Sequence, residues 1–172
     1  MRVLYRAGQF WQALTATPAT EELNHARQVL APQLMALFLN QPASEQVHSL
    51  RVFTRLCLDG VRSTDLLAAA LLHDVGKSRY PLRIWERVLV VIGQALVRCQ
   101  DTSRDEHEPH GWKRPFIIAS RHANWGAEMA AEAGASPLTV ELIRRHHDPL
   151  AGGLNHPDDQ LLHRLQMFDH SS

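Results

Sequence analysis

Histidine and aspartate side chains recur on the apolar faces of predicted helices in this sequence, or directly at a helix end. Residues three and four apart share one helix face, and on that basis these groups adjoin leucine, isoleucine, valine or alanine side chains. The groups are His48, His73, Asp74, His122, His146, His147 and Asp169. Burying an imidazole or a carboxylate costs free energy unless the group is paired or binds a metal ion. We therefore expect these side chains to converge on a metal centre.

The candidate ligand atoms are nitrogen and oxygen, without cysteine sulfur. Seven such groups exceed one tetrahedral coordination shell, so we expect two divalent metal ions. Nitrogen and oxygen ligands favour iron or manganese, with zinc, cobalt and nickel also compatible, over Cu(I) or a structural zinc. Magnesium is less favoured because histidine is a poor ligand for a hard cation.

One stretch, His73-Asp74-Val75-Gly76-Lys77, directly follows the apolar helical run 66–72. The ammonium group of Lys77 lies close in sequence to two candidate ligands, where it could hold a substrate phosphate. The same stretch also fits a plain helix C-terminus, in which His73 caps carbonyl groups, Gly76 is the C′ residue and Lys77 complements the helix dipole. The other candidate ligands favour the metal site.

Further charged side chains near these positions have two possible roles. Arg121, Arg144 and Arg145 are candidates for binding phosphate oxygens, the alternative being that they form solvated helix faces. The remaining histidines are expected on polar faces, in loops or in the tail. These are His25, His107, His110, His156, His163 and His170.

The elements that must position these groups are predicted to be helices throughout. Alanine and leucine dominate, and strict apolar–polar alternation is absent, which indicates an all-α fold. Pro32 is expected to kink or split its helix, and Ser63 to cap another. Residues 82–98 form an amphipathic pattern that favours core packing over a partner or membrane surface. We expect helices over residues 8–14, 20–39, 44–58, 64–72, 82–98, 115–133, 137–148 and 157–169, with a polar loop over 100–113.

Composition narrows the class of protein. The chain has 172 residues and a formal net charge of zero, which favours one domain and argues against a broad nucleic-acid-binding surface. Cys57 and Cys99 are isolated and fit reduced thiols in a cytoplasmic protein. We see no signal peptide, and the longest apolar stretch, 88–97, is too short to span a bilayer. Residues 1–41 are expected to be a helical extension packed on a core formed by residues 42–172.

The ordered series of histidines and aspartates resembles the HD superfamily of metal-dependent phosphohydrolases, over about Ser44 to Asp169. The motif at residues 73–77 and the doubled His146-His147 look most like the HD-GYP branch, which hydrolyses cyclic dinucleotides. This chain departs from that branch, because residues 148–155 contain no Gly-Tyr-Pro. Some members carry a glutamate one turn before the first histidine and hold a third metal, but here that position is Ser44, with Glu45 out of phase. Specificity for cyclic-di-GMP and a third metal are therefore not predicted.

The resemblance implies an all-α helical bundle and an assignment of ligands. His48, His73, Asp74 and Asp169 would hold one metal. Asp74 would bridge to a second metal, completed by His122 with His146, His147 or both. Asp74 and Lys77 would be the catalytic residues, with Lys77 contacting a phosphate of the substrate.

The implied activity is hydrolysis of a phosphoester in a nucleotide or a small phosphorylated compound, as a phosphatase or phosphodiesterase. Two alternatives remain open on the sequence. Some HD-superfamily members are di-iron oxygenases with nearly the same ligands, and a non-catalytic domain could keep the metals while binding a nucleotide as a sensor. Lys77 favours hydrolysis because an anionic phosphate accounts for it directly. The oligomeric state stays open.

Overall fold

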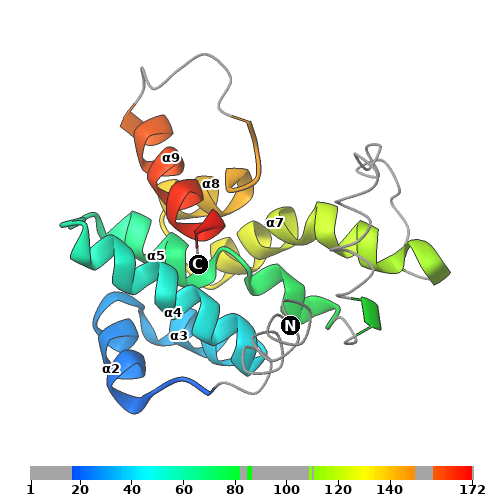
Figure 1. Cartoon of the computed structure of the whole chain (residues 1–172), viewed down its shortest axis with the longest axis horizontal. Coiled ribbons are helices and arrows are strands. Elements are labelled where there is room, and N and C mark those ends of the chain that lie inside the picture. The colour runs from blue at the N-terminus through cyan, green and yellow to red at the C-terminus, as the bar shows by residue number, and fades with distance from the viewer. Residues whose placement is uncertain (1–16, 82–84, 87–108, 110, 150–156, 172) are drawn as a thin grey trace, which may run out of the picture.

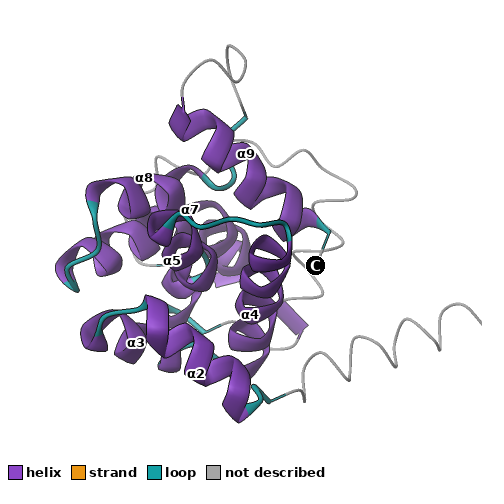
Figure 2. Ribbon diagram, turned by 90° about the vertical axis from the view of Figure 1, so that its left-hand side faces the viewer, coloured by secondary structure: helices purple, strands orange, loops and turns teal. Residues whose placement is uncertain are grey.

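The computed structural model describes residues 17–81, 85–86, 109, 111–149 and 157–171, and all regular elements in these ranges are helical (Figures 1 and 2). The all-α prediction is therefore confirmed. The predicted helices at 8–14 and 82–98, and most of the predicted loop at 100–113, lie outside the described residues. The elements are α2 (Thr20–Val29), α3 (Pro32–Leu39), α4 (Ala43–Leu58), α5 (Thr64–Leu72), the 3₁₀ helix η1 (Val75–Arg79), the 3₁₀ helix η2 (Gly111–Lys113), α7 (Arg114–Glu132), α8 (Pro137–Arg145) and α9 (Pro157–His170).

Helix α5 is the centre of the bundle, and α4, α8, α9 and the N-terminal helices α2 and α3 pack around it (Figure 2). Every residue from Leu66 to Leu72 is buried, so this helix has no solvent-facing stripe. A helix that is apolar on all sides is stable only when other elements surround it. Its C-terminal end, where the candidate site begins, is consequently held inside the molecule.

Local sequence chemistry sets several helix boundaries. The hydroxyl of Ser63 accepts a hydrogen bond from the Leu66 backbone N–H at 3.3 Å, which caps α5 as predicted. Ser136 caps α8 in the same way, followed by Pro137 in the first turn. Pro32 separates α2 from α3, which confirms the predicted split.

Helices α2 and α3 contribute to the same hydrophobic core as α5. Their buried side chains include Ala26, Leu34 and Phe38, which belong to one cluster with Leu71 and Leu165. The described residues N-terminal to α4, 17–42, are therefore part of the packed structure. Among the described helices, none combines the length and the apolar character needed to cross a membrane.

Candidate metal centre

Asp74 lies at the junction between α5 and η1, directly after His73, the C-cap residue of α5. The side chain of His73 turns back to its own helix, where Nδ1 donates to the Ala70 carbonyl at 2.9 Å. Both residues are buried, with 0% and 3% of their surface exposed. This junction therefore brings an imidazole and a carboxylate into the interior of the bundle.

Gly76 follows in η1. Its role differs from that of a C′ residue at a plain helix C-terminus, the alternative that the sequence allowed. Its φ is not positive, unlike that of Gly60 or Gly134. A Cβ at this position would lie 1.9 Å from the His122 carbonyl oxygen and 2.6 Å from the Gly126 nitrogen. Glycine is thus required because η1 packs directly on the backbone of α7. This close approach places Asp74 beside His122.

The first triad of candidate ligands is His48, His73 and Asp169, from α4, the end of α5 and α9. Asp169 Oδ1 lies 2.8 Å from His48 Nε2 and 3.4 Å from His73 Nε2. The two imidazole Nε2 atoms are 3.3 Å apart. Three helices therefore bring one potential ligand atom each to a common point.

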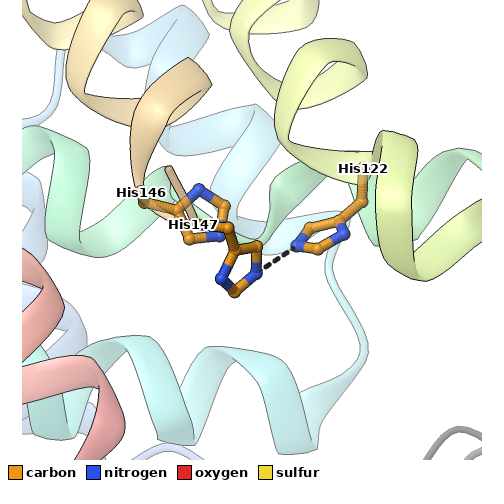
Figure 3. Close-up of side chains that lie close together, drawn as sticks. All are labelled: His122, His146 and His147. Atoms are coloured by element: carbon orange, nitrogen blue, oxygen red, sulfur yellow. Dashed lines mark hydrogen bonds between the residues drawn. The ribbon is translucent and has the colours of Figure 1, made fainter. Parts of the chain in front are cut away.

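The second triad is His122, His146 and His147, from α7 and the C-terminal end of α8 (Figure 3). His147 Nε2 lies 3.2 Å from His122 Nε2. Adjacent residues in an α-helix point about 100° apart. Both histidines reach the same cluster because α8 ends at Arg145, immediately before them.

The carboxylate of Asp74 lies between the two triads. Its Oδ1 is 3.3 Å from His122 Nε2 and 4.0 Å from His146 Nε2. Its Oδ2 is 3.5 Å from His73 Nε2 and 3.9 Å from His48 Nε2. Each oxygen thus faces a different triad, which is the arrangement that a bridging carboxylate needs.

Hydrogen bonds to the main chain fix the imidazole tautomers. Like His73, His122 donates from Nδ1 to a carbonyl, that of Ala119 at 2.9 Å, and His146 donates to that of Ile143 at 2.7 Å. Because a carbonyl oxygen only accepts, each Nδ1 carries the proton and Nε2 is the atom left to coordinate a metal.

Within the described residues, the buried Nε2 of His146 has no hydrogen-bond partner. Burial, followed by the neighbouring imidazoles of His73 and His147, lowers the pKa of His146 well below its usual range. The ring is therefore neutral and keeps its lone pair. A buried acceptor without a donor is rare unless an ion or water completes it, so this donor set fits a metal ion.

The carboxylates of Asp74 and Asp169 favour the protonated, positively charged form of His73 in the first triad. Burial by itself would raise the pKa of Asp74, but Lys77, His73 and His122 hold it well below its usual range. Burial would lower the pKa of His73, but Asp74 and Asp169 outweigh this effect and raise it to about 9. A proton and a metal ion compete for the same Nε2 atom.

Lys77 contacts carboxylates in this structure. Its Nζ donates to Asp74 Oδ2 at 2.6 Å and to Glu45 Oε2 at 3.3 Å. The prediction that Glu45 is out of phase with His48 was wrong, because residues three apart also share a helix face and Glu45 is buried beside the site. Its position one turn before His48 was the signal that the sequence offered.

The candidate arginines have different surroundings. Arg144 lines a pocket of about 510 Å³ together with Ser120, Asn124, His147 and others. Arg145 instead pairs with Asp159 of α9 at 2.9 Å. The guanidinium of Arg121 lies 5.3 Å from the centre of the Trp125 ring. The structure thus brings one of the three, Arg144, together with a candidate ligand in a pocket.

The histidines predicted to lie away from the site include His25, His163 and His170, which are exposed. His107, His110 and His156 lie outside the described residues.

The sequence profile of the HD domain family matches residues 46–170, a segment that includes both triads and Asp74. It begins within α4 and ends with α9. No curated protein and no solved structure matches the chain significantly.

Proposed function

This chain belongs to the HD domain family, and on that basis we propose that it is a metal-dependent phosphohydrolase. HD domains bind divalent metals, and the superfamily consists mainly of hydrolases. The proposed reaction is hydrolysis of a phosphoester in a nucleotide or another small phosphorylated compound.

The observation that carries this proposal is the position of Asp74 between two triads. His48, His73 and Asp169 would hold one divalent ion, and His122, His146 and His147 a second, with one oxygen of Asp74 facing each. Iron or manganese is the proposed metal, with zinc, cobalt, nickel or magnesium as alternatives. Bound ions would supply a water-derived nucleophile at neutral pH and neutralise charge on the phosphate.

The protein contributes orientation and charge. The main-chain carbonyls of Ala70, Ala119 and Ile143 hold three imidazole rings with Nε2 directed at the centre. Burial alone would favour the protonated carboxyl of Asp74, but Lys77, His73 and His122 hold its pKa well below the usual range and keep the carboxylate ionised. The charged centre therefore exists before a substrate arrives, which reduces the reorganisation needed during reaction.

The pocket beside His147 is the proposed place for the part of the substrate that lies next to the metal centre. It is lined by the polar side chains of Ser120, Asn124, Arg144 and Asp148. Arg144 forms an ion pair with Glu141 at 2.8 Å on the protein surface, and both side chains are almost half exposed. Such pairs contribute little stability, so a phosphate oxygen can replace the glutamate.

Within the superfamily, we propose that the chain lies nearest the HD-GYP branch, on the motif at residues 73–77 and the doubled His146-His147. Because Gly-Tyr-Pro is missing from residues 148–155, the proposal does not extend to cyclic-di-GMP. We also propose a cytoplasmic location, since Cys57 is a free thiol.

The test is to remove ligands and measure metal and turnover together. Protein purified without added metal should contain bound transition metal and hydrolyse at least one compound among mononucleotides, cyclic dinucleotides, sugar phosphates and p-nitrophenyl phosphate. His73→Ala and Asp74→Ala should lose metal and lower the activity by more than about 100-fold, because even the outer partners of metal ligands contribute roughly 10- to 100-fold. His163→Ala, at an exposed position of α9, is the matched control.

If both metal content and activity survive in His73→Ala or Asp74→Ala, the proposal is wrong. Oxygen consumption by a reduced di-iron form would indicate an oxygenase. Nucleotide binding without turnover across several metals would indicate a sensor domain.

A further inference from the structure

Lys77 joins two carboxylates at the edge of the first triad. Its ammonium group, on η1, lies between Asp74 Oδ2 at 2.6 Å and Glu45 Oε2 at 3.3 Å. The side chains of Glu45 and Asp74 are 12% and 4% exposed and that of Lys77 is 30% exposed, so both contacts are partly shielded from water. Charge interactions in such surroundings are stronger than in bulk water.

The oxygen that binds Lys77 is the one that faces the first triad. Asp74 Oδ2 lies 3.5 Å from His73 Nε2 and 3.9 Å from His48 Nε2. The second triad faces the other oxygen, Oδ1. A divalent ion in the first triad would therefore compete with the ammonium group for Oδ2 and would be repelled by it.

Glu45 offers Lys77 another acceptor. It is located on α4 and already accepts a hydrogen bond from Lys77 Nζ at 3.3 Å. A small shift of the ammonium group toward Glu45 would release Oδ2 while keeping the ammonium group, whose side chain is 30% exposed, paired with a carboxylate.

We propose that Glu45 is a positioning residue that draws Lys77 away from Asp74, and that Lys77 and Glu45 together set the metal affinity of the first triad. This inference rests on the metal centre of the proposed function. Lys77 is thus an internal cation that the first metal displaces from Asp74, and the displacement leaves its charge beside the centre for an anionic substrate.

The experiment is calorimetric titration of the metal-free protein with Mn²⁺, which reads binding without turnover. The variants are Lys77→Met, Glu45→Gln and the double variant. His147→Ala assigns the signal of the second triad. Arg79→Met is the matched control, because Arg79 is on the same η1 segment but pairs with the exposed Glu128.

Lys77→Met should tighten binding at the first triad by about tenfold or more, since a close like charge is removed. Glu45→Gln should weaken it by about fivefold or more, a coupling of ordinary size. In the Lys77→Met background, Glu45→Gln should change the affinity by less than about twofold, because its effect acts through Lys77. Arg79→Met should leave both sites unchanged.

Unchanged or weaker Mn²⁺ binding in Lys77→Met would overturn the inference and leave the metal centre standing. If Glu45→Gln weakens Mn²⁺ binding equally in the wild-type and Lys77→Met backgrounds, the inference is also overturned, because Glu45 would then act as a direct ligand. If the wild-type protein binds no metal, the proposed function itself fails. Circular dichroism checks the fold of each variant, and Lys77→Gln provides the same test should Lys77→Met not fold.

Discussion

Two adjacent arginines in the last turn of α8 have different partners and should give different phenotypes. Arg144 lines the pocket beside His147, whereas Arg145 pairs with Asp159 of α9. Sequence alone could not distinguish their roles, because both lie in the last turn of the same helix, directly before the candidate ligands His146 and His147. The distinction depends on where α9 packs.

Arg144→Met should raise the KM for the phosphorylated substrate by about tenfold and change kcat little, since the proposed contact binds ground state and transition state alike. Steady-state kinetics at two salt concentrations measure this, and the difference from wild type should shrink at high salt. Arg145→Met is the control: it should leave KM unchanged and lower stability by no more than about 1 kcal/mol. Equal KM values for wild type and Arg144→Met would remove Arg144 from the binding site.

At the same scale, the candidate ligands could be chosen from the sequence because each one breaks an apolar helix face. The structure brings all of them together around Asp74. The inward position of Glu45 was missed because only a spacing of four residues from His48 was considered. The engagement of Lys77 by two carboxylates was not predictable, because it requires α4 and η1 to be adjacent.

Contact between η1 and α7 is the element-scale feature on which the site depends. Gly76→Ala should destabilise the fold by about 3 kcal/mol, because a Cβ would lie 1.9 Å from the His122 carbonyl oxygen and backbone must move to relieve the overlap. Urea unfolding measures the change. The movement also separates Asp74 from His122, so the variant should bind less metal.

Gly126→Ala, on the opposite side of the same contact, is the comparison. Its Cβ would come no closer than 3.1 Å to Gly76, and alanine is the better helix former by about 1 kcal/mol. We expect its stability to stay within about 1 kcal/mol of wild type. Equal stability of both variants would show that the close approach of η1 and α7 is not needed.

Local signals placed most helix boundaries correctly, since caps and prolines act through neighbouring residues. Ser63, Ser136 and Pro32 are examples in which the side chain at the boundary determines where a helix begins. The function of Gly76 was not accessible in that way. Glycine at a helix end suggests a left-handed turn, and only the tertiary contact shows that the lack of a side chain is what matters.

For the whole molecule, residues 1–41 are proposed to be part of one folding unit with the core. The large buried side chains of α3, Leu34, Met35 and Phe38, each stabilise the core by about 1.5–3 kcal/mol. A domain's net stability is about 5–15 kcal/mol. A chain beginning at residue 42 should therefore unfold at a much lower temperature or aggregate.

Thermal unfolding and size-exclusion chromatography of the truncated chain test this prediction. Phe38→Ala in the full chain is a milder version and should cost about 3–5 kcal/mol. If the truncated chain shows the wild-type unfolding temperature, residues 1–41 are a peripheral segment.

The hydrogen bonds from His73, His122 and His146 to main-chain carbonyls have an evolutionary consequence. Each acceptor belongs to the residue three positions earlier on the same helix, so no side-chain replacement at Ala70, Ala119 or Ile143 can delete it. The orientation of the rings therefore depends on the helix backbone and not on the side chains of the acceptor residues. Sequences around such a centre can drift far apart while the geometry persists. A saturation-mutagenesis library read for metal binding should tolerate polar or larger residues at Ala119, which lines the pocket, yet none in place of His122.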